Sequence, residues 1–297
     1  MKSVAILLST YNGEKYIQEQ IDSLLAQTYK NIKIFVRDDG STDNTINVLK
    51  KYGNKITLIN GKNVGIIESF KKLLANSGTF DYYSFCDQDD IWEKNKIEIA
   101  IQKFNNCNCD IPVLYASSYD VYDANMNFLY SAKNKKNISF VNSLFETISP
   151  GMTMVFNKNA RDILLETLNK NCDLHDSWLY KVCAGLGKVI YDSEKSVKYR
   201  RYEGTFTVTK NGFISNLKWN FNYFINGNHW NKTYKLLNYY KQCFYDKLDN
   251  DSKNLISLFT TKKSILKQIK KIFYRKRFKD SILSEIKLRF MFLIWKI

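Results

Sequence analysis

The segment Tyr82-Tyr83-Ser84-Phe85-Cys86-Asp87-Gln88-Asp89-Asp90-Ile91-Trp92 decides the fold of this chain. An apolar run of strand length ends in three carboxylates, and the sequence then becomes apolar again. Carboxylates that crowd together at the end of a buried strand favour a bound cation. Hard divalent ions such as Mg²⁺ and Mn²⁺ prefer oxygen ligands and commonly bind together with phosphates. The segment therefore predicts a metal-bound, phosphorylated substrate.

Apolar runs that end in polar residues recur along the first half of the chain. Residues 4–9 end in Thr10-Tyr11-Asn12, residues 32–37 end in Asp38-Asp39, and residues 56–59 form a third short run. Apolar residues at helical spacing follow each run, for example within residues 17–25. Strands that alternate with helices in this way predict a mostly parallel α/β sheet. Such sheets bind ligands at the carboxyl ends of their strands, where these polar groups lie.

The composition is that of a folded domain in a reducing compartment. With 297 residues and 44% hydrophobic content, the chain can bury one large core. The six cysteines show no C-x-x-C spacing, and the first residues lead into a strand-like run without a signal-peptide pattern. We therefore expect a cytoplasmic location.

The net charge of +16 is concentrated in the last third of the chain. Residues 1–209 carry 26 basic and 24 acidic side chains, a net charge of +2, whereas residues 210–297 carry 19 and 5, a net charge of +14. We expect a near-neutral folded domain over residues 1–209 and a basic, aromatic-rich helical extension over residues 210–297. Aromatic residues of this extension include Trp219, Phe221, Tyr223 and Phe224.

One segment of the extension has the pattern of a helix that lies on a membrane. Ile265, Ile269, Ile272 and Phe273 share one side of a predicted helix, and lysines surround them. This composition is typical of an interfacial helix on an anionic lipid surface. A basic face in solvent and packing against the folded domain are the alternatives. The apolar run at residues 290–295 is far shorter than the roughly twenty residues that a spanning helix needs.

Common phosphate and calcium motifs are missing from the sequence. Neither G-x-G-x-x-G after the first strand nor G-x-x-x-x-G-K-[ST] occurs, which excludes the Rossmann dinucleotide and P-loop classes. A calcium-binding EF-hand loop starting at Asp87 is excluded because Ile91 and Trp92 occupy a ligand position and the position of the turn glycine. The phosphates must be bound by other groups.

Several motifs together resemble family 2 inverting glycosyltransferases of the GT-A fold. They are residues 5–12, 38–43, 63–65 and 86–92, in this order and spacing, and the resemblance covers roughly residues 3–205. Within the family, Gly151-Met152-Thr153, the segment at residues 175–179 and Tyr199-Arg200 are similar to bacterial rhamnosyltransferase-like enzymes. The resemblance implies an α/β GT-A fold with a mostly parallel central sheet flanked by helices, followed by the basic helical extension.

The resemblance also implies roles for particular residues. Thr10, Tyr11 and Asp39 would hold the nucleotide base, with Asp39 accepting from the pyrimidine N–H. Asp87 would orient the ribose or a metal-bound water. Asp89 would bind the divalent metal, Mg²⁺ or Mn²⁺, which neutralises the leaving nucleoside diphosphate.

An inverting enzyme needs a base that deprotonates the acceptor hydroxyl, and by resemblance this base is Asp176. The alternative is an Asp that caps a helix starting at Ser177. Asp90 is assigned to the turn or to the cap of the following helix.

The segment after Tyr199 departs from the family pattern. Relatives often carry a His there, whereas this chain reads Arg200-Arg201-Tyr202-Glu203-Gly204. By charge and hydrogen bonding, Arg200 and Arg201 are expected to bind the diphosphate instead.

The implied function is transfer of a sugar, with rhamnose as a candidate, from dTDP-rhamnose or a UDP-sugar to a lipid-linked glycan in capsule or O-antigen synthesis. The enzyme would be peripheral at the inner face of the cell membrane. A relative that binds a sugar nucleotide without catalysis is one alternative. A nucleic-acid-binding protein is disfavoured because clustered carboxylates repel phosphate. A nucleotidyltransferase would carry a glycine-rich basic loop where this chain has Thr10-Tyr11-Asn12-Gly13-Glu14.

Overall fold

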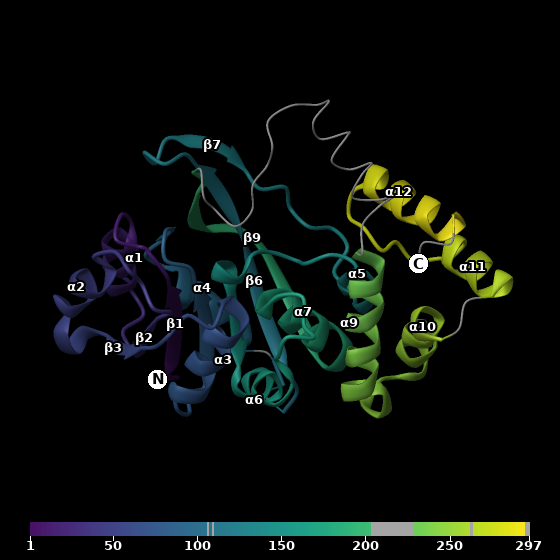
Figure 1. Cartoon of the computed structure of the whole chain (residues 1–297), viewed down its shortest axis with the longest axis horizontal. Helices are drawn as coiled ribbons and strands as arrows, with labels where there is room; N and C mark the ends of the chain where they lie inside the picture. The colour runs from purple at the N-terminus through teal and green to yellow at the C-terminus, as the bar shows by residue number, and fades with distance from the viewer. Residues whose placement is uncertain (106, 109, 203–228, 262–263, 295–297) are drawn as a thin grey trace. The chain divides into compact units, whose positions relative to one another are not determined.

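The structure, a computed structural model, describes residues 1–105, 107–108, 110–202, 229–261 and 264–294 (Figure 1). The aromatic cluster expected at residues 219–224 and the residues Glu203 and Gly204 lie outside the described residues. The chain forms two compact units. The first unit comprises Met1–Ile138 and Thr147–Arg201, and the second comprises Ser139–Glu146 and Tyr202–Ile297. No local pattern in the sequence predicts that Ser139–Glu146 belongs with the C-terminal part.

The first unit is built on a sheet that has nine strands within the described residues. Their order is β3-β2-β1-β4-β8-β6-β9-β5, and β7 pairs with β6. The strands are β1 (Val4–Thr10), β2 (Ile32–Asp38), β3 (Thr57–Asn60), β4 (Tyr82–Cys86), β5 (Ile91–Trp92), β6 (Val113–Tyr122), β7 (Phe128–Ser131), β8 (Met154–Asn157) and β9 (Lys188–Arg200). Strands β1 to β4 are parallel, as are β6 and β9, whereas β5, β7 and β8 pair antiparallel with their neighbours. The predicted α/β fold is confirmed: the strands β1 to β4 form a parallel part, and the rest of the sheet is mixed.

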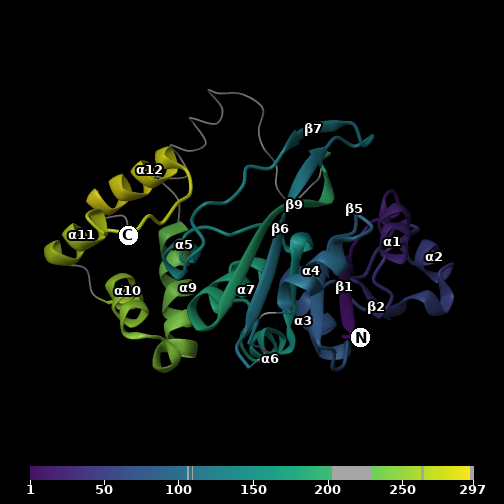
Figure 2. The ribbon, with the colours of Figure 1, turned by 180° about the vertical axis from the view of Figure 1, so that it is seen from behind.

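Helices cover both faces of this sheet (Figure 2). They are α1 (Ile17–Leu25), α2 (Thr45–Lys50), α3 (Ile66–Asn76), α4 (Lys96–Phe104), α6 (Lys158–Thr167) and α7 (His175–Leu186). Because side chains alternate along a strand, Val4, Ile6 and Leu8 of β1 face one layer, which they share with buried residues of α1, α2 and α4. On the other face, α3, α6 and α7 pack against one another and against β1, β8 and β9. This two-sided burial explains why β1 is apolar throughout.

The second unit contains α5 (Phe140–Ser143), α9 (His229–Phe244), α10 (Asn250–Thr260), α11 (Ile265–Ile272) and α12 (Ile282–Leu293). Phe145, Phe259, Phe278 and Phe292 form its aromatic core, with every pair of ring centroids 5.1 to 6.1 Å apart. Such edge-to-face packing explains how the segment 139–146 is bound into this unit. None of the described helices is both long and apolar enough to cross a bilayer.

Candidate active site

The loops after β1, β2 and β4 lie at one edge of the sheet because these strands are adjacent and parallel. The side chain of Gln88 joins two of these loops. Its Oε1 accepts hydrogen bonds from Thr10 Oγ1 at 2.7 Å and from the Tyr11 backbone N at 2.8 Å, and its Nε2 donates to the Tyr11 carbonyl at 3.3 Å. A Cβ at Gly13 would lie 2.7 Å from Gln88 Oε1 and 2.8 Å from Thr10 Oγ1, so a larger residue there would displace this hydrogen-bonded pair. No signal in the sequence singled out Gln88, since its partners lie 77 or more positions away.

The two carboxylates after β2 have different surroundings. Asp38 makes the turn, because its Oδ2 accepts from the backbone N–H groups of Gly40 at 3.0 Å and Ser41 at 2.9 Å. Asp39 is only 4% exposed, forms an ion pair with Arg37, and accepts from the backbone N–H groups of residues 64 and 65, both at 2.9 Å. A carboxylate has about four acceptor sites, so three of those of Asp39 already hold protein groups.

The three predicted base-binding residues therefore differ in access. Thr10 is buried and bonded to Gln88, Asp39 is buried under the loop at residues 63–65, and Tyr11 is 45% exposed. Thr10 and Asp39 are adjacent, since the Asp39 N–H donates to the Thr10 carbonyl at 2.8 Å. The structure brings this group together, and its contact with a base stays a prediction.

Carboxylates from two distant parts of the chain, the loop after β4 and the start of α7, influence each other's surroundings. Asp87 is partly exposed, and burial together with the charges of Asp89 and Asp176 raises its pKa from 3.8 to about 7. Asp89 and Asp176 both add to the raised pKa of Asp87, and like charges that act on one carboxylate in this way favour a nearby cation. The structure thus unites the predicted ribose, metal and base residues, which lie almost ninety positions apart in sequence.

Asp176 lies inside the first turn of α7, because the helix begins at His175 and its N-cap is Leu174. The alternative in which Asp176 caps a helix from Ser177 is wrong. Its Oδ1 accepts from the Ser177 N–H at 2.7 Å and its Oδ2 from the Gly151 N–H at 3.1 Å. Burial raises the pKa of Asp176 from 3.8 to about 6, although these two hydrogen bonds oppose the shift. A carboxylate with this pKa can accept a proton near neutral pH.

The neighbouring His175 supports the turn that carries Asp176. Its buried ring stacks on Phe70 with centroids 3.8 Å apart and meets the edge of Phe85 at 4.6 Å. Burial lowers the pKa of His175 to about 3, so the ring is neutral. A Cβ at Gly151 would lie 2.9 Å from Nε2 of this ring, so glycine is required for the contact.

Arg200 is 2% exposed, and its guanidinium binds protein groups on three sides. Nε donates to the Asp89 carbonyl at 2.9 Å, Nη1 donates to the Ala124 carbonyl at 2.8 Å, and Nη2 pairs with Glu19 at 2.5 Å. The guanidinium also lies 4.3 Å from the centre of the Tyr16 ring. These contacts give Arg200 a supporting position behind the acidic loop, and its contact with a diphosphate stays a prediction.

Of the two roles expected for Asp90, in the turn or at the cap of the following helix, the structure contradicts the second. Its Oδ1 accepts from the Arg200 backbone N–H at 3.0 Å, and the cap of α4 is Asn95. Burial and the charges of Asp89 and Asp87 raise the pKa of Asp90 well above its usual range. Asp90 is therefore a buried anchor between the acidic loop and β9, and the assignment to a helix cap is wrong.

A buried lysine that sequence reasoning missed lies under the same loop. Lys96 Nζ is 3.8 Å from the centre of the Trp92 ring and 3.4 Å from Ser84 Oγ. Burial lowers its pKa to about 7. A lysine at the start of an amphipathic helix is normally exposed to solvent, so only the tertiary packing reveals that Lys96 is buried.

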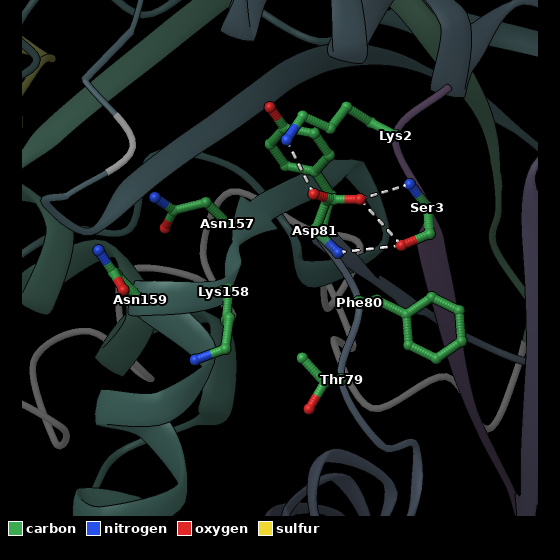
Figure 3. A pocket seen from close by; sticks show the side chains of 9 residues that line it. Lys2, Ser3, Thr79, Phe80, Asp81, Asn157, Lys158 and Asn159 are labelled. Carbon is green, nitrogen blue, oxygen red and sulfur yellow. Dashed lines mark hydrogen bonds and ion pairs between the residues drawn. The ribbon is translucent and has the colours of Figure 1, made fainter.

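A separate cavity of about 320 Å³ lies at the opposite edge of the sheet (Figure 3). Its lining includes Lys2, Ser3 and Asp81, which precede β1 and β4. Asp81 accepts from Lys2 Nζ at 2.9 Å and from the Ser3 backbone N at 2.8 Å. This cavity lies away from the converging carboxylates and is not part of the candidate active site.

Comparison with known sequences identifies the class. The profile of Glycosyl transferase family 2 matches residues 5–171. The dTDP-rhamnosyl transferase RfbG of Shigella flexneri is 33% identical over 215 residues, which cover 66% of this chain and 72% of that protein. The glycosyltransferase GlyA of Streptococcus pneumoniae is 28% identical over 218 residues, which cover 69% of this chain and 31% of that protein.

Solved structures share the fold. Residues 1–349 of S. aureus TarS superpose with a TM-score of 0.60 at 14% identity, covering 92% of this chain and 75% of that chain. The complex of the same TarS fragment with UDP-GlcNAc gives a TM-score of 0.54 at 16% identity, covering 86% and 80%. The fold and the sequence matches define a glycosyltransferase of the GT-A fold. The chain belongs to family 2 of these enzymes, as predicted from its motifs.

Proposed function

We propose that this family 2 enzyme transfers a sugar, with rhamnose as the leading candidate, from a nucleoside-diphosphate sugar to a hydroxyl of a lipid-linked glycan, with inversion. The acceptor would be an intermediate of capsule or O-antigen synthesis at the inner face of the cell membrane. The similarity to a dTDP-rhamnosyl transferase supports dTDP-rhamnose as donor, with UDP-sugars as alternatives. The observation that carries the proposal is the match to Glycosyl transferase family 2 over residues 5–171, and the influence of Asp89 and Asp176 on the pKa of Asp87 supports the roles of these three carboxylates.

Asp176 is the proposed general base. Its two bonded backbone N–H groups fix the carboxylate in orientation, and its pKa of about 6 leaves it mostly ionised at neutral pH. It would take the proton from the acceptor hydroxyl as that oxygen attacks the anomeric carbon, while the nucleoside diphosphate leaves from the opposite face. The neutral, buried ring of His175 packs on Phe70 next to this carboxylate and adds no charge to it.

The donor set fits a divalent cation, Mg²⁺ or Mn²⁺, held by Asp89 with Asp87 beside it. Within the described residues no group of three or more His, Cys, Asp or Glu side chains is arranged to hold a metal. The protein would thus supply few ligands, and the donor phosphates would supply others, as is usual for Mg²⁺. A cation there would neutralise charge on the diphosphate and would offset the repulsion from Asp89 and Asp176 that adds to the effect of burial on the pKa of Asp87.

Thr10, Tyr11 and Asp39 remain the proposed base-binding group, with Tyr11 the accessible member. For Arg200 we propose support of the acidic loop, since its three N–H contacts fix the Asp89 carbonyl, the Ala124 carbonyl and the Glu19 carboxylate. Diphosphate binding then depends on the metal and on other donors.

The test is a donor screen that measures nucleoside diphosphate release. The full chain is incubated with dTDP-rhamnose or UDP-sugars, Mg²⁺ or Mn²⁺, and membrane-extracted acceptor. We expect acceptor-dependent release with one donor, and loss of release but not of donor binding in Asp176→Asn. Asp162→Asn is the matched control, because Asp162 is a carboxylate of α6 that pairs with Lys158 and Arg161. Donor binding without release for any donor would favour a binding-only relative.

A further inference from the structure

Helix α11 is oriented with its apolar side toward water. Ile265, Leu266, Ile269 and Phe273 are 46% to 78% exposed. On the opposite side, Gln268 and Lys271 are almost fully buried. The Lys271 ammonium group lies 5.1 Å from the centre of the Phe259 ring, in the core of the second unit. An amphipathic helix on a water-soluble surface normally buries its apolar side, so this orientation indicates a further contact.

Helix α12 carries apolar residues on two sides, one buried and one exposed. Leu288, Met291 and Phe292 are buried and pack toward the aromatic core, together with Glu285. A second set of apolar residues faces outward and is 39% to 69% exposed: Ile282, Leu283, Ile286, Phe290, Leu293 and Ile294. The core contacts of α12 are already made by its buried side, so folding of the unit does not account for the outward set.

The two exposed sets have the same spacing. In α11 they fall at i, i+1, i+4 and i+8, and α12 repeats these positions and extends them by one turn. The helices contact each other and are drawn as neighbours in both views (Figure 1, Figure 2). We call these ten residues the apolar surface. Monomeric proteins rarely expose so many large apolar side chains on adjacent elements unless the patch binds something.

The charges around the apolar surface identify the partner. Residues 264–294 contain nine Lys and Arg against two acidic residues, a net charge of +7. Exposed members are Lys270, Arg275, Lys276, Arg277 and Lys287. One of the two acids, Glu285, is buried and pairs with Arg289 at 2.7 Å. This charge would repel a second copy of the chain and attract an anionic lipid surface.

We propose that α11 and α12 dock together on an anionic bilayer, with the apolar surface at the boundary between headgroups and acyl chains. Long basic side chains beside it reach the lipid phosphates. This inference deepens the proposed function, on which it rests for its lipid-linked acceptor. It also corrects the stripe predicted from sequence: Ile272 is half-buried, whereas Leu266 and the outward residues of α12 belong to the surface.

The test measures binding of the full chain to vesicles by flotation, without any sugar donor. Vesicles of phosphatidylcholine with 30% phosphatidylglycerol are compared with pure phosphatidylcholine. We expect binding to the anionic vesicles that falls at least tenfold in a variant carrying Leu266→Asp, Phe273→Asp, Leu283→Asp and Phe290→Asp. These side chains are all more than half exposed, so the variant should fold. The matched control is Leu129→Asp in β7, where Leu129 is 50% exposed outside the apolar surface.

The outcomes separate this proposal from its competitors. Equal binding by the fourfold variant, or absence of vesicle binding by the wild-type chain, would overturn it. A wild-type dimer that becomes monomeric in the fourfold variant, without vesicle binding, would assign the surface to a second copy. Donor hydrolysis or transfer is measured separately, so loss of vesicle binding with intact turnover, or the reverse, shows which proposal failed.

Discussion

Replacement of Asp176 by Asn should make the protein inactive but more stable at neutral pH. In the folded protein the pKa of Asp176 is raised, mainly by burial, from 3.8 to about 6. Between these two values the folded state keeps a proton that the unfolded state has released, so stability falls as pH rises through this window. At about 1.4 kcal/mol per pKa unit, the ionised carboxylate costs about 3 kcal/mol of folding free energy above pH 7.

Asn cannot ionise and avoids this cost, but the exchange has a cost of its own. Both Asp176 oxygens accept backbone N–H groups, from Gly151 and Ser177. An amide offers one oxygen, so one N–H would meet an NH₂ group, which costs about 1–2 kcal/mol. We therefore expect Asp176→Asn to be about 1–2 kcal/mol more stable than wild type at pH 8. Below about pH 4 the carboxyl is neutral in both states, so the gain disappears.

Urea unfolding measures the predicted difference in stability between wild type and Asp176→Asn from pH 4 to 8. EDTA is present, and fluorescence of the buried Trp178 is one of the signals. Nucleoside diphosphate release should fall by about 10²- to 10⁴-fold, the usual contribution of a general base. Asp162→Asn serves as the control and should change neither quantity strongly. The pKa argument would be refuted if the stability difference between Asp176→Asn and wild type were the same at pH 8 as at pH 4. Full turnover would refute the catalytic one.

Other substitutions test the groups around this carboxylate. Arg200→Lys should lower stability by about 2–3 kcal/mol, because one ammonium group cannot replace contacts to two carbonyls and Glu19, and it should raise the KM for the donor. Arg275→Lys, at an exposed position outside the candidate active site, is the control and should change neither quantity. Unchanged stability of Arg200→Lys in urea would argue against the support role. Gly151→Ala places a Cβ 2.9 Å from His175 Nε2, so we expect about 1–3 kcal/mol of destabilisation and a lower kcat. A wild-type kcat would show that the turn accommodates the added methyl group. Asp89→Asn should weaken Mg²⁺-dependent donor binding at least tenfold in titration calorimetry, while its melting temperature stays close to that of the wild type. EDTA should weaken donor binding by the wild-type enzyme in the same way. Donor binding that does not depend on metal would contradict the assignment.

The amino-acid sequence by itself determined the elements and their order. The apolar run at residues 4–9 and the spacing in residues 17–25 predict β1 and α1, because burial on two faces or on one stripe leaves a local pattern. Carboxylates at the ends of adjacent parallel strands must meet at one edge, so the approach of Asp39 to Thr10 also follows from local signals. The resemblance to family 2 rests on the same segments and is confirmed.

Only the tertiary structure decided which of these groups are free to bind a ligand. Asp39 and Arg200 have the residue types of ligand-binding groups, yet their hydrogen bonds go to loops that are distant in sequence. The environment of Asp176 depends on burial and on Gly151, and burial raises its pKa. The periodicity of α11 shows that the helix is amphipathic, but it contains no information about which side meets the core. That choice depends on Phe259 and its neighbours, since packing energy is a property of contacts between distant segments.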